Sequence, residues 1–307
     1  MTTSFLKGSE IVFEVNNKQF EYVHGYKDNE LLRSSFNALT QRVYGFDFED
    51  WYANGYWADN YVPHSLVYEG SVVANSSVSI IDFDFDGQKK RYVQIGTVMT
   101  TPEYRGLGLS RYLMEKIMAE WKDKCDMIYL YANDSVLSFY PKFGFEKADE
   151  YQIVCPVNAG GQPSLQKVDM DDNRNRLTLF EKIKHAKPVA KLAMINNPGL
   201  VMFYLTSFMK DNVYYISEYD TYVIIEIDDD VVYLQDIFCE TEVKLEEVIR
   251  CILANESRKV VLGFTPKCED GFEKCLLEAE DTTLFVYGND AERFKDSKVM
   301  FPVLSHT

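Results

Sequence analysis

The sequence has few of the residues that build metal centres. Its four histidines are scattered along 307 residues, and its six cysteines show no CxxC spacing. Zinc sites are typically built from such residues at short, regular spacing, so we expect no bound metal. Thiols without a pairing pattern favour a reducing compartment. We therefore expect a cytoplasmic protein with buried, reduced cysteines.

Long apolar runs and an excess of basic residues are also missing. No uninterrupted apolar segment approaches the roughly 18 residues that a membrane-spanning helix needs. The opening MTTSFLKGSE lacks the basic start and apolar run of a signal peptide. The 32 basic and 48 acidic residues give a formal net charge of −16, which disfavours nucleic-acid binding because phosphates are repelled. This acidity is compatible with a cationic substrate, and equally with an acidic surface that only keeps the protein in solution.

The composition and the hydrophobic pattern indicate two folded units. Hydrophobic residues make up 46% of the 307 residues, which is enough for a sizeable core and suggests two domains. Strands and helices alternate up to about residue 157, and the order strand-strand-strand-helix-strand-helix-strand returns in the second half. The segment NAGGQPS (158–164) is rich in glycine and small polar residues. It predicts a linker between a first domain, 1–157, and a second domain, 165–307.

Three of the predicted elements bear on this division. The segment YQIVCPV (151–157) is expected to be the last strand of the first domain. The segment DSVLSFYPKFG (134–144) is expected to be a short helix closed by a glycine, and GFEKCLLEA (271–279) a helix of the second domain. With these elements the chain is predicted to belong to the mixed α/β class.

A glycine-rich turn leads directly into an amphipathic helix in the segment TPEYRGLGLSRYLM (101–114). The start of a helix offers unpaired backbone N–H groups and a partial positive charge, so a glycine turn at this place favours an anion site. A dinucleotide fingerprint would need a third glycine where Arg111 stands, and a P-loop would need Gly-Lys-Ser/Thr. The turn alone is also compatible with a purely structural role.

The context of this turn resembles motif A of the GNAT superfamily of N-acetyltransferases. That motif reads Arg/Gln-x-x-Gly-x-Gly/Ala between the fourth strand and the third helix of the family's fold. Arg105 and Gly108 match it, and Ser110 replaces the final small residue. The resemblance implies a GNAT (acyl-CoA N-acyltransferase) fold. It also implies that the pyrophosphate of acetyl-CoA binds to the loop formed by Arg105, Gly106, Leu107, Gly108, Leu109 and Ser110.

A second segment resembles motif B of the same family, Asn-x-x-Ala-x-x-x-Tyr-x-Lys-x-Gly-Phe. In NDSVLSFYPKFGF the residues in register are Asn133, Tyr140, Lys142, Gly144 and Phe145, while Val136 stands where alanine is usual. The two resemblances together cover roughly residues 20 to 155. They imply that Asn133 binds the pantetheine arm of the coenzyme. The other residues from Lys142 onward are expected to be structural.

The resemblance also implies roles in acetyl transfer. Backbone N–H groups near the end of the fourth strand, at Val98 and Met99, would polarise the thioester carbonyl. Tyr140 would be the general acid that protonates the leaving thiolate, although a buried core tyrosine explains the same residue. No carboxylate on this strand offers itself as general base. Asp82 and Asp84 are candidates, but a solvated hairpin explains both, and a chain of water molecules is the alternative base.

An aromatic patch lies where the family binds its acceptor. It is interspersed with acidic residues and would hold a cationic amine, or it would be core or an interface between the domains. The patch consists of Phe46, Phe48, Trp51, Tyr52, Tyr56, Trp57 and Tyr61.

The second half keeps the order of elements but not the glycine loop. CETEVKLEEVIRC stands where TPEYRGLGLSRYL stood, and its glutamates would repel a phosphate. We therefore expect two tandem GNAT-like domains, with a catalytic first domain and a degenerate second domain that shapes the acceptor cleft. One coenzyme should bind per chain, and a chain cut near Gly160 should leave a first half that still binds it.

The expected activity is acetyl transfer from acetyl-CoA to a primary amine of a small molecule or a peptide. Two alternatives remain open. One is aminoacyl transfer of the kind known for other tandem GNAT proteins. The other is a non-catalytic sensor of acyl-CoA, which the missing general base favours.

Overall fold

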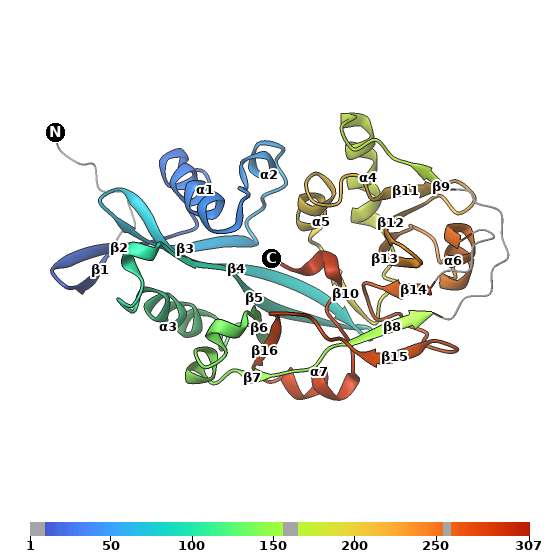
Figure 1. Cartoon of the computed structure of the whole chain (residues 1–307). Helices are drawn as coiled ribbons and strands as arrows, with labels where there is room; N and C mark the ends of the chain where they lie inside the picture. Colours follow the sequence, from blue (N-terminus) through green and yellow to red (C-terminus); the bar gives the residue numbers. More distant parts are fainter. Residues whose placement is uncertain (1–9, 156–164, 254–258) are drawn as a thin grey trace.

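The computed structural model describes residues 10–155, 165–253 and 259–307 (Figure 1). Two mixed β-sheets lie side by side, one in each half of the molecule, and helices cover their faces. In Figure 1 the helices α1 and α2 lie above the first sheet, with α3 below it, and α4 and α5 stand at the second sheet. The predicted linker, 158–164, lies outside the described residues, so the division into domains at that point stays a prediction.

The first sheet runs in the order β1-β2-β3-β4-β5-β6-β16-β7, and β10 pairs with β4 beyond this path. β3 pairs with β4 only as far as Ser79, and β10 pairs with the rest of β4, from Asp82 to Phe85. The strands are β1 (Glu10–Val15), β2 (Lys18–His24), β3 (Tyr61–Tyr68), β4 (Ser71–Phe85), β5 (Gln88–Thr100), β6 (Met127–Ala132), β7 (Glu146–Lys147), β10 (Leu192–Ile195) and β16 (Thr283–Tyr287).

The second sheet runs in the order β9-β11-β12-β13-β14-β8-β15. Its strands are β8 (Tyr151–Cys155), β9 (Leu165–Lys167), β11 (Val213–Ile216), β12 (Thr221–Asp228), β13 (Val231–Phe238), β14 (Lys259–Leu262) and β15 (Glu273–Leu276). Most of the buried residues from β12 to β14 are Val, Ile and Leu, which is typical of strands covered on both faces.

Capping residues mark both ends of α1. Asn29 caps α1, its side chain accepting a hydrogen bond from the Leu32 N–H, and Gly45 ends the helix with a φ of 80°. Gly108 stands at the start of α3, directly after the turn. The helices are α1 (Glu30–Tyr44), α2 (Glu49–Ala53), α3 (Leu109–Trp121), α4 (Asn173–His185), α5 (Pro198–Leu205), α6 (Leu245–Leu253) and α7 (Ala291–Ser297).

The two sheets repeat one topology. β5 and β6 are parallel and are joined through α3, and β13 and β14 are parallel and are joined through α6. Beside each parallel pair lies an antiparallel strand, followed by one more edge strand: β16 and β7 in the first sheet, β8 and β15 in the second. The predicted repeat is therefore present in its strand-strand-strand-helix-strand part, whereas neither half forms the second α-helix of the predicted order at 134–144 or 271–279.

The halves exchange one strand each. β8 directly follows the first half in sequence but lies between β14 and β15 of the second sheet. β16 belongs to the second half in sequence but lies between β6 and β7 of the first sheet. The prediction that YQIVCPV is the last strand of the first domain's own sheet is thus wrong, although its described part, Tyr151–Cys155, is a strand. Neither sheet is complete without the other half.

Two other predicted elements differ from the structure. The segment 134–144 forms two 3₁₀ turns, Asp134–Val136 and Tyr140–Phe143, rather than one α-helix. Pro141 removes a backbone donor at this place, which disfavours continuous α-helical hydrogen bonding. The segment 271–279 contains the edge strand β15 and not a helix, because pairing with β8 satisfies its backbone.

Candidate active site

The glycine turn closes a cavity at the start of α3. Gly106 and Gly108 have φ values of 77° and 81°, and a Cβ atom on either would meet no heavy atom within 4 Å. Glycine is therefore needed here for its backbone conformation and not for lack of space. The cavity has a volume of about 330 Å³ and is lined by Thr100, Tyr104, Arg105, Gly106, Gly108, Leu109, Ser110, Arg111 and Phe139.

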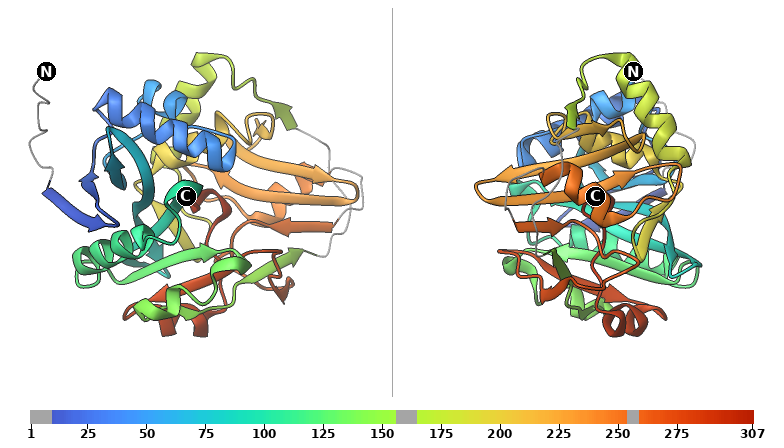
Figure 2. Two further views of the ribbon diagram at one scale, coloured as in Figure 1. Left: turned by 60° about the vertical axis from the view of Figure 1, so that its left-hand side comes forward. Right: turned by 90° about the vertical axis from the view of Figure 1, so that its right-hand side faces the viewer.

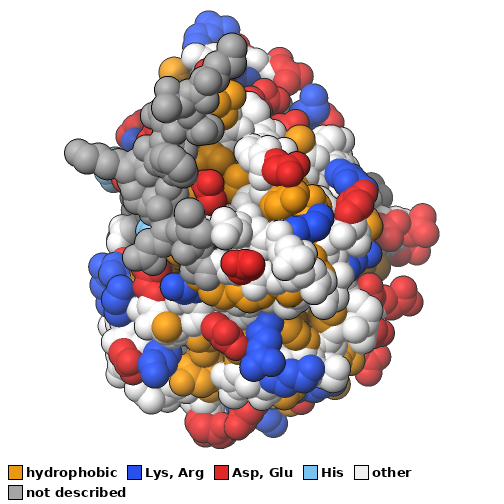
Figure 3. Space-filling view, turned by 90° about the vertical axis from the view of Figure 1, so that its left-hand side faces the viewer, with side chains coloured by type: hydrophobic (Ala, Val, Ile, Leu, Met, Phe, Trp, Pro, Cys, Tyr) orange, Lys and Arg blue, Asp and Glu red, His pale blue; other side chains and the backbone are white. Residues whose placement is uncertain are grey.

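The chemistry of this cavity suits a phosphate. The first N–H groups of α3 have no partner within the helix and point toward its start. The guanidinium of Arg105 is exposed, and its Nε donates to the Thr100 carbonyl oxygen at 3.3 Å. The hydroxyl of Ser110 lies 2.9 Å from that of Thr100, and Leu109 is buried and anchors the turn. On the outer face of this half, Lys and Arg side chains stand beside Asp and Glu, despite the net charge of −16 (Figure 3).

A β-bulge distorts β5 just before the turn. Ser77 of β4 faces Gly96, and Asn75 faces Met99, so β5 contains one extra residue. Thr97 stands in the bulge with a φ of 49°. The Asn75 amide donates to the Thr97 carbonyl oxygen at 2.8 Å. The bulge therefore fixes the direction of the backbone at Val98 and Met99, the two residues predicted to polarise a carbonyl.

Two tyrosines converge on this bulge. The Tyr44 hydroxyl, at the end of α1, donates to the Val98 carbonyl oxygen at 3.0 Å. Tyr140 is 4% exposed, and burial, with a smaller effect of Tyr44, raises the pKa of Tyr140 to about 12. Tyr140 thus keeps its proton at neutral pH and lies near Tyr44. No motif singles out Tyr44, which is only the last residue of an amphipathic helix.

Asn133 lies between the end of β6 and the first 3₁₀ turn. Its side chain is exposed, and its Oδ1 accepts a hydrogen bond of 2.5 Å from the Ser135 hydroxyl. It precedes the first of the two 3₁₀ turns and does not cap that turn with its side chain. Its role toward the pantetheine arm stays a prediction.

β5 and β6 separate beside the bulge. Their parallel pairing runs from Tyr92 with Met127 to Gln94 with Tyr129 and ends there. Side chains alternate between the two faces of each strand beyond this point. Ile95, Leu130 and Ala132 pack with Tyr140 on one face, which α3 covers. The opposite face, toward which Tyr129 and Tyr131 point, packs against Phe301 of the second half.

The last residues of the second half line this opposite face. A Cβ atom on Gly96 would collide with the backbone oxygen of Thr307, and the Gln94 amide donates to that oxygen at 3.3 Å. The Tyr131 hydroxyl lies 3.0 Å from Nε2 of His306 and also donates to Glu150 at 3.1 Å. The end of the chain accordingly lies in the middle of the molecule, near α1 and the first sheet (Figures 1 and 2). No sequence pattern singled out Tyr131, Glu150 or His306.

Asp82 and Asp84, the carboxylates considered as general bases, lie at the far end of β4. Asp82 forms ion pairs with Arg91 at 2.9 Å and Lys89 at 3.3 Å. Burial would raise the pKa of Asp82, but the hydrogen bonds and charges of Arg91 and Lys89 outweigh it and lower the pKa. Asp84 accepts a hydrogen bond from the Gly87 N–H in the hairpin. Both side chains therefore interact with residues of the β4–β5 hairpin, which is the structural role that the sequence also allowed.

The chain itself enters the matching gap of the second sheet, and a cavity of about 480 Å³ remains beside it, lined in part by Val189, Asp236 and Phe264. β13 and β14 separate after Leu234 and Leu262, and the segment 187–191 enters between their continuations. The Lys187 N–H donates to the Cys239 carbonyl oxygen, and the Lys191 N–H to that of Thr265, both at 2.7 Å. Glu246 and Glu247 also stand in the first turn of α6. The carbonyl oxygens of Cys239 and Thr265, which border this gap, are thus already paired with the chain's own N–H groups.

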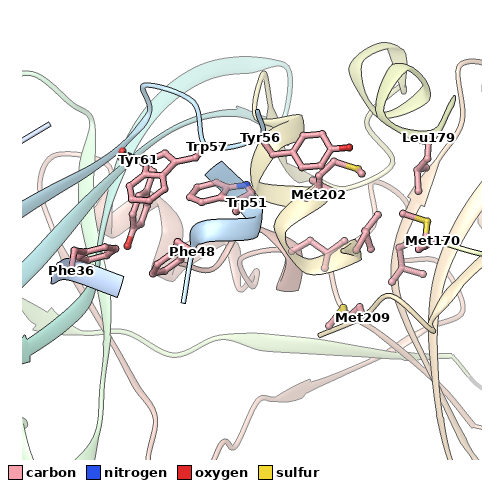
Figure 4. Packing of buried hydrophobic residues seen from close by; sticks show 14 of the residues in the cluster. Phe36, Phe48, Trp51, Tyr56, Trp57, Tyr61, Met170, Leu179, Met202 and Met209 are labelled. Carbon is pink, nitrogen blue, oxygen red and sulfur yellow. Dashed lines mark hydrogen bonds between the residues drawn. The ribbon is translucent and has the colours of Figure 1, made fainter. Parts of the chain in front are cut away.

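The aromatic patch lies mainly at the interface between the halves. Phe48, Trp51 and Trp57 are buried in one cluster with Met202 and Leu179 of the second half (Figure 4). The Trp51 indole donates to the carbonyl oxygen of Gly199, on α5, at 2.7 Å. The interface reading therefore accounts for most of the patch.

Within residues 10–155, 165–253 and 259–307, no group of three or more His, Cys, Asp or Glu side chains is placed to hold a metal ion. In the same described parts, none of the helices has the length and hydropathy needed to cross a bilayer.

Comparison with known proteins adds the family. Residues 28–148, which contain the bulge, the glycine turn and Tyr140, match the acetyltransferase (GNAT) domain family. This segment is a GNAT acetyltransferase domain. The resemblance read from the two motifs is therefore confirmed, and proteins of this family use acyl-CoA. No curated protein matches the sequence.

Solved structures extend the likeness in fold to most of the chain. One is a conserved protein of unknown function from Enterococcus faecalis V583, with a TM-score of 0.58 and 14% identity over 90% of this chain and 74% of that one. Another is a GCN5-related N-acetyltransferase from Kribbella flavida, with a TM-score of 0.52 and 14% identity over 88% of this chain and 72% of that one. Both likenesses concern the fold alone.

Proposed function

We propose that this chain is an N-acetyltransferase that moves the acetyl group of acetyl-CoA to a primary amine, on a small molecule or a peptide. The observation that carries the proposal is the arrangement around α3. A glycine turn suited to a pyrophosphate directly follows a bulged strand, and a buried, protonated tyrosine packs against Val98 of that strand.

The reaction would proceed by direct attack of the amine on the thioester. The turn from Arg105 to Ser110 would hold the pyrophosphate, and Asn133 would contact the pantetheine arm. A main-chain N–H of Val98 or Met99 would polarise the carbonyl, and a fixed donor of this kind is worth about 3 kcal/mol in the transition state. Tyr140 would give its proton to the departing thiolate and regain one from the nitrogen of the tetrahedral intermediate.

The second half would complete the acceptor side and bind no coenzyme of its own. Its strand β16 pairs with β6, and its last residues lie against β5. The segment 187–191 enters the gap between its own strands β13 and β14. We accordingly propose one coenzyme per chain. A cytoplasmic location, without nucleic-acid or membrane partners, remains part of the proposal and rests on the composition.

The test is thiol release from acetyl-CoA in the presence of a panel of primary amines, with the acetylated product identified by mass spectrometry. Amine-dependent release supports the proposal. Tight binding of acetyl-CoA without turnover of any amine would instead indicate a sensor, and transfer from aminoacyl-tRNA would indicate the aminoacyl transferase.

A further inference from the structure

Glu150, Tyr131 and His306 form a hydrogen-bonded row that has no role in the mechanism proposed above. Glu150 is 8% exposed and lies between β7 and β8. Its Oε1 accepts hydrogen bonds from the Phe301 N–H at 2.8 Å and from the Tyr131 hydroxyl at 3.1 Å. The Tyr131 hydroxyl lies 3.0 Å from Nε2 of His306, and the two ring centroids are 4.5 Å apart.

This row lies beside the place where the pairing of β5 and β6 ends. Tyr131 stands two residues beyond Tyr129, where the pairing of the two strands ends. His306 is only partly buried, and the next residue, Thr307, lies directly on Gly96 of β5. Tyr140 packs on the other face of the same strands. A group that leaves beside Tyr140 and a nucleophile that enters beside His306 would thus meet the carbonyl from different sides.

We propose that His306 is the general base for the acceptor amine, and that Tyr131 and Glu150 are positioning residues that carry its proton away. This inference rests on the proposed function, because it assigns the group that removes the proton of the attacking nitrogen.

The hydrogen bonds define the state of each member. When the Tyr131 hydroxyl donates to ionised Glu150, its oxygen accepts from Nε2–H of His306, and Nδ1 then carries the lone pair. An incoming ammonium gives a proton to Nδ1. The Nε2 proton passes to the Tyr131 oxygen, and the Tyr131 proton passes to Oε1 of Glu150. One N–H bond of the ammonium breaks, an O–H bond forms on Glu150, and the amine is neutral and ready to attack.

The surroundings favour this route over a charged imidazolium. Burial lowers the pKa of His306 to about 4, so a cationic ring is disfavoured and the proton must move on. Burial, partly offset by the bonds from Phe301 and Tyr131, raises the pKa of Glu150 to about 7. An acceptor with a pKa near the working pH is the most effective one.

Two further tyrosines face this row. Tyr204 of α5 donates to the His306 carbonyl oxygen at 2.9 Å, and Tyr129 lies beside Tyr131 on β6. Burial raises the pKa of both above the usual value for tyrosine, and Glu150 adds to this effect at Tyr129. Both are therefore neutral at pH 7 and leave Glu150 as the group that titrates.

Two amines of nearly equal size separate a base from a structural role. Ethylamine is an ammonium ion at pH 7, as an alkylamine with a pKa near that of lysine, about 10, must be. Methoxyamine is neutral at that pH and needs no base before it attacks. We would measure kcat/KM for both probes at saturating acetyl-CoA, for the wild type, Tyr131→Phe, Glu150→Gln, His306→Gln and the control Tyr129→Phe. The control keeps the neighbouring ring and lies outside the row.

The proposal expects a selective loss. The three variants of the row should lose about 10²-fold or more with ethylamine, the usual contribution of a general base, and little with methoxyamine. The wild-type kcat/KM with ethylamine should rise up to about pH 7 and then level off. In Glu150→Gln it should instead keep rising toward the pKa of the amine, about 10, because only the neutral amine then attacks. Equal losses with both probes, or an unchanged pH profile in Tyr131→Phe and Glu150→Gln, would overturn the assignment. If the wild type turns over neither these probes nor any amine of the panel, the proposed function fails instead.

Discussion

The hydroxyl of Tyr44 donates a hydrogen bond of 3.0 Å to the carbonyl oxygen of Val98. Through this bond the end of α1 holds the bulged part of β5, where the backbone would meet the thioester carbonyl. Tyr44 also lies near Tyr140 and contributes to its raised pKa. The bond therefore joins the two parts of the site that we propose to act on opposite ends of the scissile C–S bond.

Replacing Tyr44 with phenylalanine tests this link. The ring stays, and the bond to Val98 is lost, which removes about 1 kcal/mol. We expect kcat to fall roughly fivefold, while the affinity for acetyl-CoA, measured by calorimetry, stays the same. A variant with wild-type kcat, when chemistry limits the rate, would show that Tyr44 does not hold the bulge in its working position.

The anion site at α3 depends on Gly108. We expect Gly108→Glu to abolish coenzyme A binding in calorimetry, because a carboxylate would enter the place of a phosphate. The matched control is Gly87→Glu in the β4–β5 hairpin. Gly87 has a φ of 77°, close to the 81° of Gly108, and an added Cβ is equally free of contacts. Both variants thus suffer the same backbone strain. Retained coenzyme A binding in Gly108→Glu would show that the pyrophosphate does not bind at this turn.

Tyr140 should matter for catalysis and not for binding. Tyr140→Phe keeps the buried ring and deletes the proton donor, so we expect kcat to fall about 10²–10⁴-fold. The melting temperature and the acetyl-CoA dissociation constant should change little. Single-turnover measurements make the comparison, because they report the chemical step. An unchanged single-turnover rate would leave Tyr140 with its packing role alone.

The chain should bind one coenzyme. In the second sheet, the segment 187–191 enters the gap between the separating strands, and its Lys187 and Lys191 N–H groups form hydrogen bonds there. Glutamates stand at the start of α6. Titration calorimetry with coenzyme A should therefore give a stoichiometry of one per chain. A second site, persisting in Gly108→Glu, would contradict this account of the second half.

Local signals carried much of the prediction. The turn from Arg105 to Ser110 was readable because glycine at positive φ and a following amphipathic helix are properties of neighbouring residues. The order of strands and helices was readable for the same reason, since hydrophobic alternation is local. The anion site and the mixed α/β class followed from these patterns.

What the sequence did not show depends on distant residues. Tyr131 and His306 stand 175 positions apart and meet only because the end of the second half returns to the first sheet. The exchange of β8 and β16 is equally hidden, because an alternating pattern does not name the partner of a strand.

The exchange also overturns the expectation for a chain cut near Gly160. Each fragment would lack a strand from the interior of its sheet, so we now expect the isolated first half not to fold.

The most direct measurement of the central claim counts thiol released against acetylated amine formed, with acetyl-CoA and the best amine of the panel. It compares the wild type, Gly87→Glu and Gly108→Glu. The account predicts equal amounts of thiol and acetylated amine for the first two proteins and neither product for Gly108→Glu. Thiol released without acetylated amine, or equal turnover in Gly108→Glu, would contradict the account.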